Sequence, residues 1–111
     1  MASNGLVALT DMAERIARAG GVEGEGVAAG LSNLVTGTAG NMARLGIRPA
    51  MTGPVVRGDT RTVGKHLEVL AGAEPAVREA YVVLMRRLVE MSVEAGHGEA
   101  SAYEEILGLL E

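Results

Sequence analysis

A stretch of turn-forming residues near the middle of the chain, T-G-P-V-V-R-G-D at positions 52–59, most constrains how the chain can fold. Gly53, Pro54 and Gly58 interrupt any regular backbone structure. Asp59 can accept hydrogen bonds from the free N–H groups of a helix that begins after it. The stretch therefore predicts a loop that separates two helical segments and caps the second one.

Apolar residues recur at helical spacing on both sides of this loop, and no segment alternates with the period of a strand. We expect five helices, at residues 3–19, 23–45, 59–71, 75–95 and 99–110 approximately. Gly20 and Gly46 are placed to end the first two helices, and Pro75 suits the first turn of the fourth. The sequence thus predicts an all-α fold, a five-helix bundle that forms a single domain over residues 1–111.

Glycines inside the second expected helix leave two interpretations open. They form two pairs with helical spacing, so that each pair shares one face: Gly26 with Gly30, and Gly37 with Gly40. Without Cβ atoms on that face, another helix could approach closely, including one from a second subunit. Alternatively, the helix breaks near residues 36–38, since each glycine costs a helix up to about 1 kcal/mol relative to alanine.

The composition indicates how the apolar residues are used. Hydrophobic residues make up 48% of the chain, yet it contains no Phe, no Trp and only two Tyr. The core must therefore consist of Leu, Val, Ile, Met and Ala. A small chain that is this apolar predicts burial of surface between subunits. We expect a homodimer that buries the apolar faces of the first two helices.

Several classes of partner and site are disfavoured. The net charge is −4 and the basic residues are scattered, which argues against a nucleic-acid surface. No apolar run reaches the roughly 20 residues that cross a bilayer, and no signal peptide is recognisable. The absence of Cys excludes disulfides and thiolate metal sites and fits a reducing cytoplasm, where we expect the protein. His66 and His97 lack the spacing of a metal site.

The loop and the helix after it carry the residues with the most chemistry. Arg57 precedes the expected helix start, where a guanidinium and free helix amides would together suit an anion. The alternative, which local chemistry alone favours, is that Arg57 and Asp59 only satisfy groups of the loop. His66 is expected on or beside the buried face of the third helix, as a hydrogen-bonded structural group or as part of a cleft.

The run T-G-P-V-V-R-G-D-T-x-T-V-x-K-H-L at residues 52–67 resembles the helical C-terminal domain of a group of oxidoreductase-like proteins. In that group, a Rossmann-type NAD(P)-binding domain precedes the helical domain. The group is similar to pyrroline-5-carboxylate reductase, ketopantoate reductase and 6-phosphogluconate dehydrogenase. The Ser3–Asn4 pair, Asn41 and Tyr81 fit the same pattern in order, so that the resemblance covers nearly the whole chain.

The resemblance implies a bundle like the C-terminal domain of 6-phosphogluconate dehydrogenase, with a role in dimerisation and on the substrate side of an NAD(P)-dependent oxidoreductase. The substrate would be a small anion, and the residues expected to line its cleft are Asn4, Asn41, Thr52, Arg57, Asp59 and His66. No Lys precedes Asn4 at the spacing of the related enzymes, and so the resemblance assigns no catalytic residue. If the resemblance holds, Arg57, His66 and an Asn should converge on one concavity.

The Rossmann part of such an enzyme is not recognisable here. No G-x-G-x-x-G follows a strand-like run, and a nucleotide-binding domain would need on the order of 150 further residues. We therefore expect this chain to be a helical half that alone binds no NAD(P) and has no dehydrogenase activity. The alternative is a self-sufficient helical interaction module, in which the loop motif is structural.

Overall fold

Five α-helices make up most of the computed structural model, which describes residues 1–111. They are α1 (Ala2–Ala19), α2 (Gly26–Leu45), α3 (Thr60–Leu70), α4 (Pro75–Glu94) and α5 (Ala100–Leu109), with a short 3-10 helix, η1 (Arg48–Ala50), after α2. No strand is present. The predicted all-α fold is confirmed, and each helix begins and ends within three residues of its predicted bounds.

Local backbone signals explain most of these bounds. Gly46 ends α2 with a φ of 96°, which favours glycine, and its N–H donates to the Met42 carbonyl at 2.9 Å. Pro75 occupies the first turn of α4, where its missing N–H costs nothing. The helix α2 continues without interruption through residues 36–38, so the alternative of a break there is wrong. The Thr36 hydroxyl donates to the carbonyl one turn earlier, at 2.8 Å, and leaves the helix intact.

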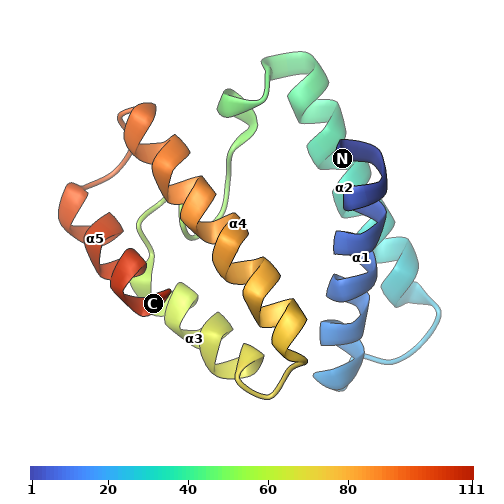
Figure 1. The fold of residues 1–111 in the computed structure, drawn as a ribbon. Coiled ribbons are helices and arrows are strands. Elements are labelled where there is room, and N and C mark those ends of the chain that lie inside the picture. The colour runs from blue at the N-terminus through green and yellow to red at the C-terminus, as the bar shows by residue number, and fades with distance from the viewer. The chain divides into compact units, whose positions relative to one another are not determined.

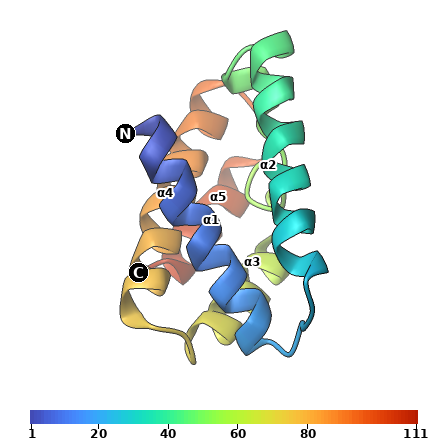
Figure 2. The same ribbon diagram turned by 90° about the vertical axis from the view of Figure 1, so that its right-hand side faces the viewer.

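The chain folds into two compact units, Met1–Ile47 and Arg48–Glu111. The first unit is a hairpin in which α1 and α2 run antiparallel side by side (Figure 1). The loop at residues 20–25 joins the end of α1 to the start of α2 (Figure 2). Only Val27 of this unit is buried.

The apolar faces predicted for α1 and α2 are therefore not enclosed. Leu9 is 42% exposed and Leu34 is 68% exposed, although both lie at helical spacing on the apolar faces of their helices. Because a pair of helices contains only one layer of contact, most of the apolar surface of each helix has no neighbour within the hairpin.

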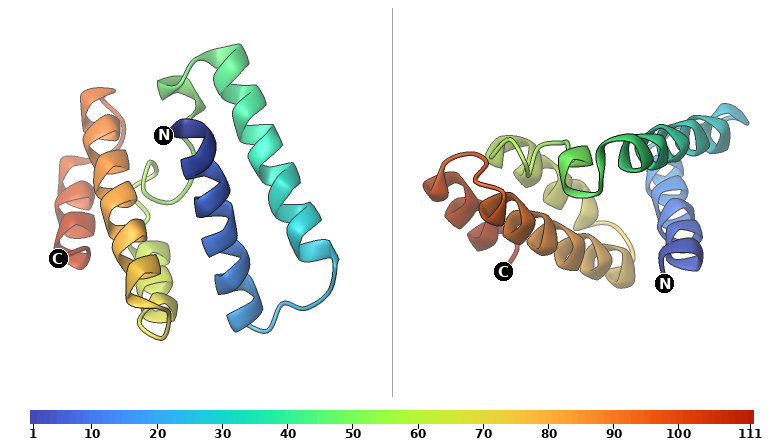
Figure 3. Two further views of the ribbon diagram at one scale, coloured as in Figure 1. Left: turned by 45° about the vertical axis from the view of Figure 1, so that its right-hand side comes forward. Right: turned by 90° about the horizontal axis from the view of Figure 1, so that it is seen from above.

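The second unit encloses a core between α3, α4 and α5, and Figure 3 shows α4 and α5 side by side. Its fully buried cluster contains Val55, Val63, Val89, Tyr103, Ile106 and Leu110. Val55 belongs to the loop before α3, so the core holds this loop as well as the helices. The Tyr103 hydroxyl donates to the Val56 carbonyl at 2.8 Å and fixes the loop against α5.

Three residues of α4 are buried, Val77, Val89 and Ser92, whereas Leu84 on the same helix is 40% exposed. The contact with α5 sets this orientation, and Arg86 reinforces it by donating to the Leu110 carbonyl at 3.0 Å. Leu107 of α5 is 38% exposed. No helix of the chain is both long and apolar enough to span a membrane.

Candidate functional site

Asp59 caps α3 as the sequence predicts. Its Oδ1 accepts a hydrogen bond from the Thr62 backbone N–H at 3.0 Å, and its Oδ2 accepts one from the Thr62 hydroxyl at 2.7 Å. The bond from the Thr62 hydroxyl does most to lower the pKa of Asp59 below its ordinary value, followed by the backbone bond and by the charges of Arg57 and Arg61. The cap is thus an ionised carboxylate at the start of the helix.

Arg57 lies beside this cap but is held only loosely. Its Nη2 atom is 3.9 Å from Asp59 Oδ2, which is too long for a hydrogen bond, and its side chain is 64% exposed. An exposed ion pair of this kind contributes little to stability. The guanidinium therefore keeps donors that face solvent, and an anion-binding role for Arg57 stays a prediction.

The backbone of the loop offers little to an anion. The N–H groups of residues 57–60 all donate to carbonyls of the loop, at 2.8 to 3.2 Å. Those of Thr62 and Val63 are bonded to Asp59. The turns of the loop and the cap use most of these groups, and assistance to Arg57 from a free helix amide stays a prediction. An anion here would be held mainly by side chains.

His66 is exposed, although it was predicted on or beside the buried face of α3. Val63 and Leu67 take the inward positions, and the His66 ring lies at their edge. Its Nδ1 atom is 3.1 Å from the Tyr81 hydroxyl on α4, and the two rings meet edge to face with centroids 5.9 Å apart. Burial raises the pKa of Tyr81 above its ordinary value, so its hydroxyl stays protonated.

The remaining predicted site residues make fewer contacts. Thr52 is exposed at the start of the loop, and Asn4 is exposed on α1. Asn41 is half-buried on α2, and its Oδ1 accepts from Arg44 Nη2 at 3.0 Å. The structure thus brings Arg57 and Asp59 together and joins His66 to Tyr81. The two Asn residues belong to the first unit and the other four to the second.

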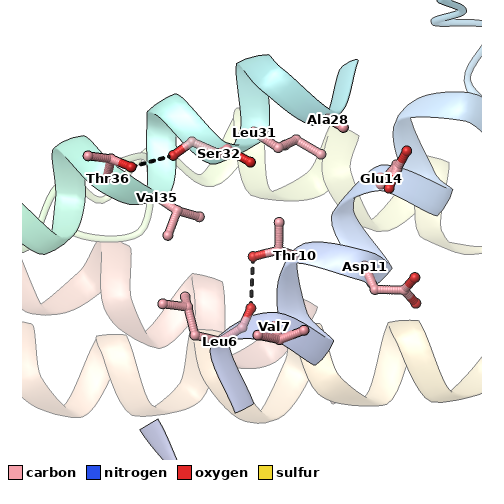
Figure 4. A pocket seen from close by; sticks show the side chains of 10 residues that line it. All are labelled: Leu6, Val7, Thr10, Asp11, Glu14, Ala28, Leu31, Ser32, Val35 and Thr36. Carbon is pink, nitrogen blue, oxygen red and sulfur yellow. Dashed lines mark hydrogen bonds between the residues drawn. The ribbon is translucent and has the colours of Figure 1, made fainter. Parts of the chain in front are cut away.

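A groove between α1 and α2 was not predicted. It has a volume of about 450 Å³, and Figure 4 shows its side chains between the two helices. Its apolar walls include Leu6, Val7, Leu31 and Val35. The Thr10 hydroxyl on its wall donates to the Leu6 carbonyl at 2.7 Å, and so it is already satisfied within its own helix. Helical spacing shows that these apolar residues share a face of their helix, but it does not show that the face stays uncovered.

Two charged residues of α1, Asp11 and Glu14, also line this groove, and the helix surface next to its other lining residues carries no charged side chain. Residues 2–10 of α1 and residues 26–43 of α2 contain no Asp, Glu, Lys or Arg, and most of them are exposed. We call these two segments the uncharged surface. It includes all four glycines of α2, and a Cβ added at any of them would have no other atom within 4 Å. Within the hairpin, α1 does not approach α2 closely at these glycines.

The structure contains no group of three His, Asp or Glu residues that could hold a metal ion. In comparisons with known proteins, no curated protein and no solved structure matches the chain. A family model described as a domain of unknown function, DUF2520, matches residues 1–88, and the chain therefore belongs to that family.

Proposed function

We propose that this chain is the dimerisation and substrate-side domain of an NAD(P)-dependent oxidoreductase. The observation that carries the proposal is the uncharged surface on α1 and α2 (residues 2–10 and 26–43). About a quarter of the residues in a typical soluble domain are charged, so an exposed helix of 20 residues with Arg44 as its only charge is unusual. Contact with a second copy explains the composition.

The dimensions of the surface fit such a contact. With a rise of about 1.5 Å per residue, the whole of α1 and α2 forms a face about 30 Å long and 20 Å wide, of which the uncharged surface occupies about two thirds. The whole face is about 600 Å² per partner before side chains are counted, close to the roughly 800 Å² that each partner contributes to a standard interface. Covering an exposed side chain such as Leu34 would contribute about 1.5–3 kcal/mol.

A second copy is the occupant that the charges favour. Two uncharged surfaces meet without repulsion between like charges. Residues 11–19 of α1 lie beyond the uncharged surface and carry charges of both signs. They form the ion pairs Asp11–Arg15, at 2.9 Å, and Glu14–Arg18, at 2.6 Å. A rim with both signs can pair with itself across a twofold axis. The open glycines also allow the backbone of a partner helix to approach α2.

Sedimentation equilibrium of the 11.4 kDa chain at micromolar concentration tests the dimer and should give twice the chain mass. Leu34→Lys places a charge on the uncharged surface and should produce monomer. Val83→Lys is the matched control, since Val83 on α4 is 66% exposed, against 68% for Leu34. A monomeric wild-type chain, or equal loss of association in the two variants, would contradict the proposed interface.

Gly30→Leu gives a second test of the same face. The substitution causes no clash inside the chain and raises helix propensity, so the monomer should become more stable. The dimer should nevertheless weaken, because the added side chain separates the two crossing helices. Association that is unchanged or stronger would place the interface elsewhere.

The oxidoreductase part of the proposal is supported by the loop motif at residues 52–67 and by its resemblance to helical domains that follow a Rossmann domain. Sequencing the DNA immediately upstream of this coding region tests the oxidoreductase role. We expect it to encode a predicted strand followed by G-x-G-x-x-G. The chain alone should give no heat of binding with NAD(P) in titration calorimetry, because it lacks this phosphate-binding loop. Tight binding by the isolated chain would overturn this division of roles.

A further inference from the structure

Three basic residues follow one another at intervals of four, Arg57 in the loop before α3 and Arg61 and Lys65 in α3 itself. All three side chains are exposed. We propose that they form a binding site for a small dianion, a molecule with a phosphate group or two carboxylates. This inference rests on the substrate-side role proposed above and adds to it the charge of the ligand and two residues, Arg61 and Lys65.

The positions of the three cations fit one ligand. Arg61 and Lys65 are one turn apart on α3, so their Cβ atoms lie about 5–6 Å from each other on the same face. The charges of Arg57 and Arg61 both lower the pKa of Asp59, so both guanidinium groups lie near the cap. Thr62 and His66 form the neighbouring row of the helix. The cations therefore flank one patch of surface.

The arrangement is unfavourable without a ligand. A helix carries positive potential at its N-terminus, and α3 has no acidic residue in its first turn apart from the capping Asp59. Basic side chains gathered at that end repel both the helix dipole and one another. Elsewhere in the chain the arginines with ion pairs meet their carboxylates at short range, as Arg48 does with Glu94 at 2.5 Å and Arg87 with Glu90 at 2.8 Å.

Arg61 and Lys65 lack such partners. Neither forms an ion pair or a hydrogen bond with another group of the chain, and Arg57 is only loosely paired to Asp59 at 3.9 Å. Three cations and one carboxylate give the patch a net charge of +2, in a chain whose total is −4. A local charge of this sign and size is complementary to a dianion, and guanidinium groups bind phosphate and carboxylate oxygens through paired N–H donors.

The extent of the patch favours a small ligand. The exposed Glu68 stands three residues after Lys65, so the next turn of α3 carries the opposite charge. A long polyanion such as a nucleic acid would pass over Glu68 and meet a chain of net negative charge. A molecule with two charges spans only the distance between neighbouring side chains.

The test is an NMR titration of the 111-residue chain with inorganic phosphate, pyrophosphate and succinate, at constant ionic strength kept with sodium chloride. We expect saturable shifts at residues 57–66 with at least one probe. Stronger binding of the phosphates identifies a phosphate-bearing ligand, and stronger binding of succinate identifies a dicarboxylate. Arg61→Gln and Lys65→Gln should each weaken binding at least about fivefold. Arg87→Gln, which removes an exposed Arg of α4, should leave it unchanged.

The proposal is overturned if the shifts do not saturate, or if the Arg61 and Lys65 variants bind like the wild type; either result means an adventitious ion only. Tighter binding of a single-stranded oligonucleotide than of every small probe would also overturn it. Circular dichroism shows that each variant remains folded. Sedimentation distinguishes failure of this proposal from failure of the dimer proposal. A monomer that binds an anion saturably contradicts only the dimer interface, and a dimer that binds no anion saturably contradicts only the anion site.

Discussion

Replacing Ile106 by Ala should destabilise the second unit strongly. Ile106 is fully buried at 0% exposure and lies in the cluster with Val55 and Val63, so its side chain has no route to solvent. Removing three carbons from such a site costs about 2–5 kcal/mol, as lost burial and as a cavity. Leu109→Ala is the control on the same helix, because Leu109 is 39% exposed and should cost less than about 1 kcal/mol.

The predicted loss is large against the whole stability of the unit. The unit spans residues 48–111, that is 64 residues, and at about 0.05–0.15 kcal/mol per residue its free energy of unfolding is about 3–10 kcal/mol. The Ile106 variant should therefore lose about a fifth or more of it and melt at least about 8 °C lower. Urea unfolding followed by circular dichroism measures both variants. A loss below about 1 kcal/mol, or equal losses at the two positions, would refute the packing of α5.

Three smaller perturbations test other contacts. Asp59→Ala should destabilise the chain through the lost helix cap. Because the folded pKa of Asp59 is lowered, the stabilisation by its carboxylate is present above about pH 4 and disappears as the pH falls through the folded value, and unfolding measurements across that range check this. In a Tyr103→Phe variant, Tyr81 is the only tyrosine. Its titration, followed by ultraviolet absorbance, should have a midpoint above about pH 10, because its pKa is raised. The stabilisation that goes with the raised pKa is present below about pH 10 and is lost as the pH rises through the folded value. Gly98→Ala should lower the melting temperature more than Gly96→Ala. Both glycines have positive φ, but only at Gly98 would an added Cβ meet the Tyr103 hydroxyl, at 2.7 Å. Equal changes in melting temperature would contradict that contact.

The sequence is sufficient to predict the elements because their limits depend on local chemistry. The stop at Gly46, the start at Pro75 and the cap at Asp59 each follow from the conformation or hydrogen bonds of a few neighbouring residues. The continuity of α2 was not decidable in this way. Its glycines disfavour a helix, and the structure nevertheless keeps 20 residues helical.

Side-chain surroundings depend on neighbours that the sequence does not reveal. Helical spacing placed His66 near the buried face, but the contacts that place its ring at Tyr81 come from α4, fifteen residues away. The same limit applies to Leu84, which periodicity could not distinguish from the buried Val89 without the position of α5. Charged residues show the same limit: the spacing of Arg61 and Lys65 is visible in the sequence, but their lack of partners is visible only in the structure.

The contrast between the two units carries the argument for association furthest. The second unit encloses its own core, whereas the first buries only Val27 in a hairpin of 47 residues. Ordering a residue costs about 1–2 kcal/mol of backbone entropy, and the hairpin encloses few side chains to offset that cost. We therefore expect the stability of α1 and α2 to depend on what covers the uncharged surface. If a second copy covers it, the first unit becomes more stable as protein concentration rises, while the core around Ile106 keeps its stability without a partner.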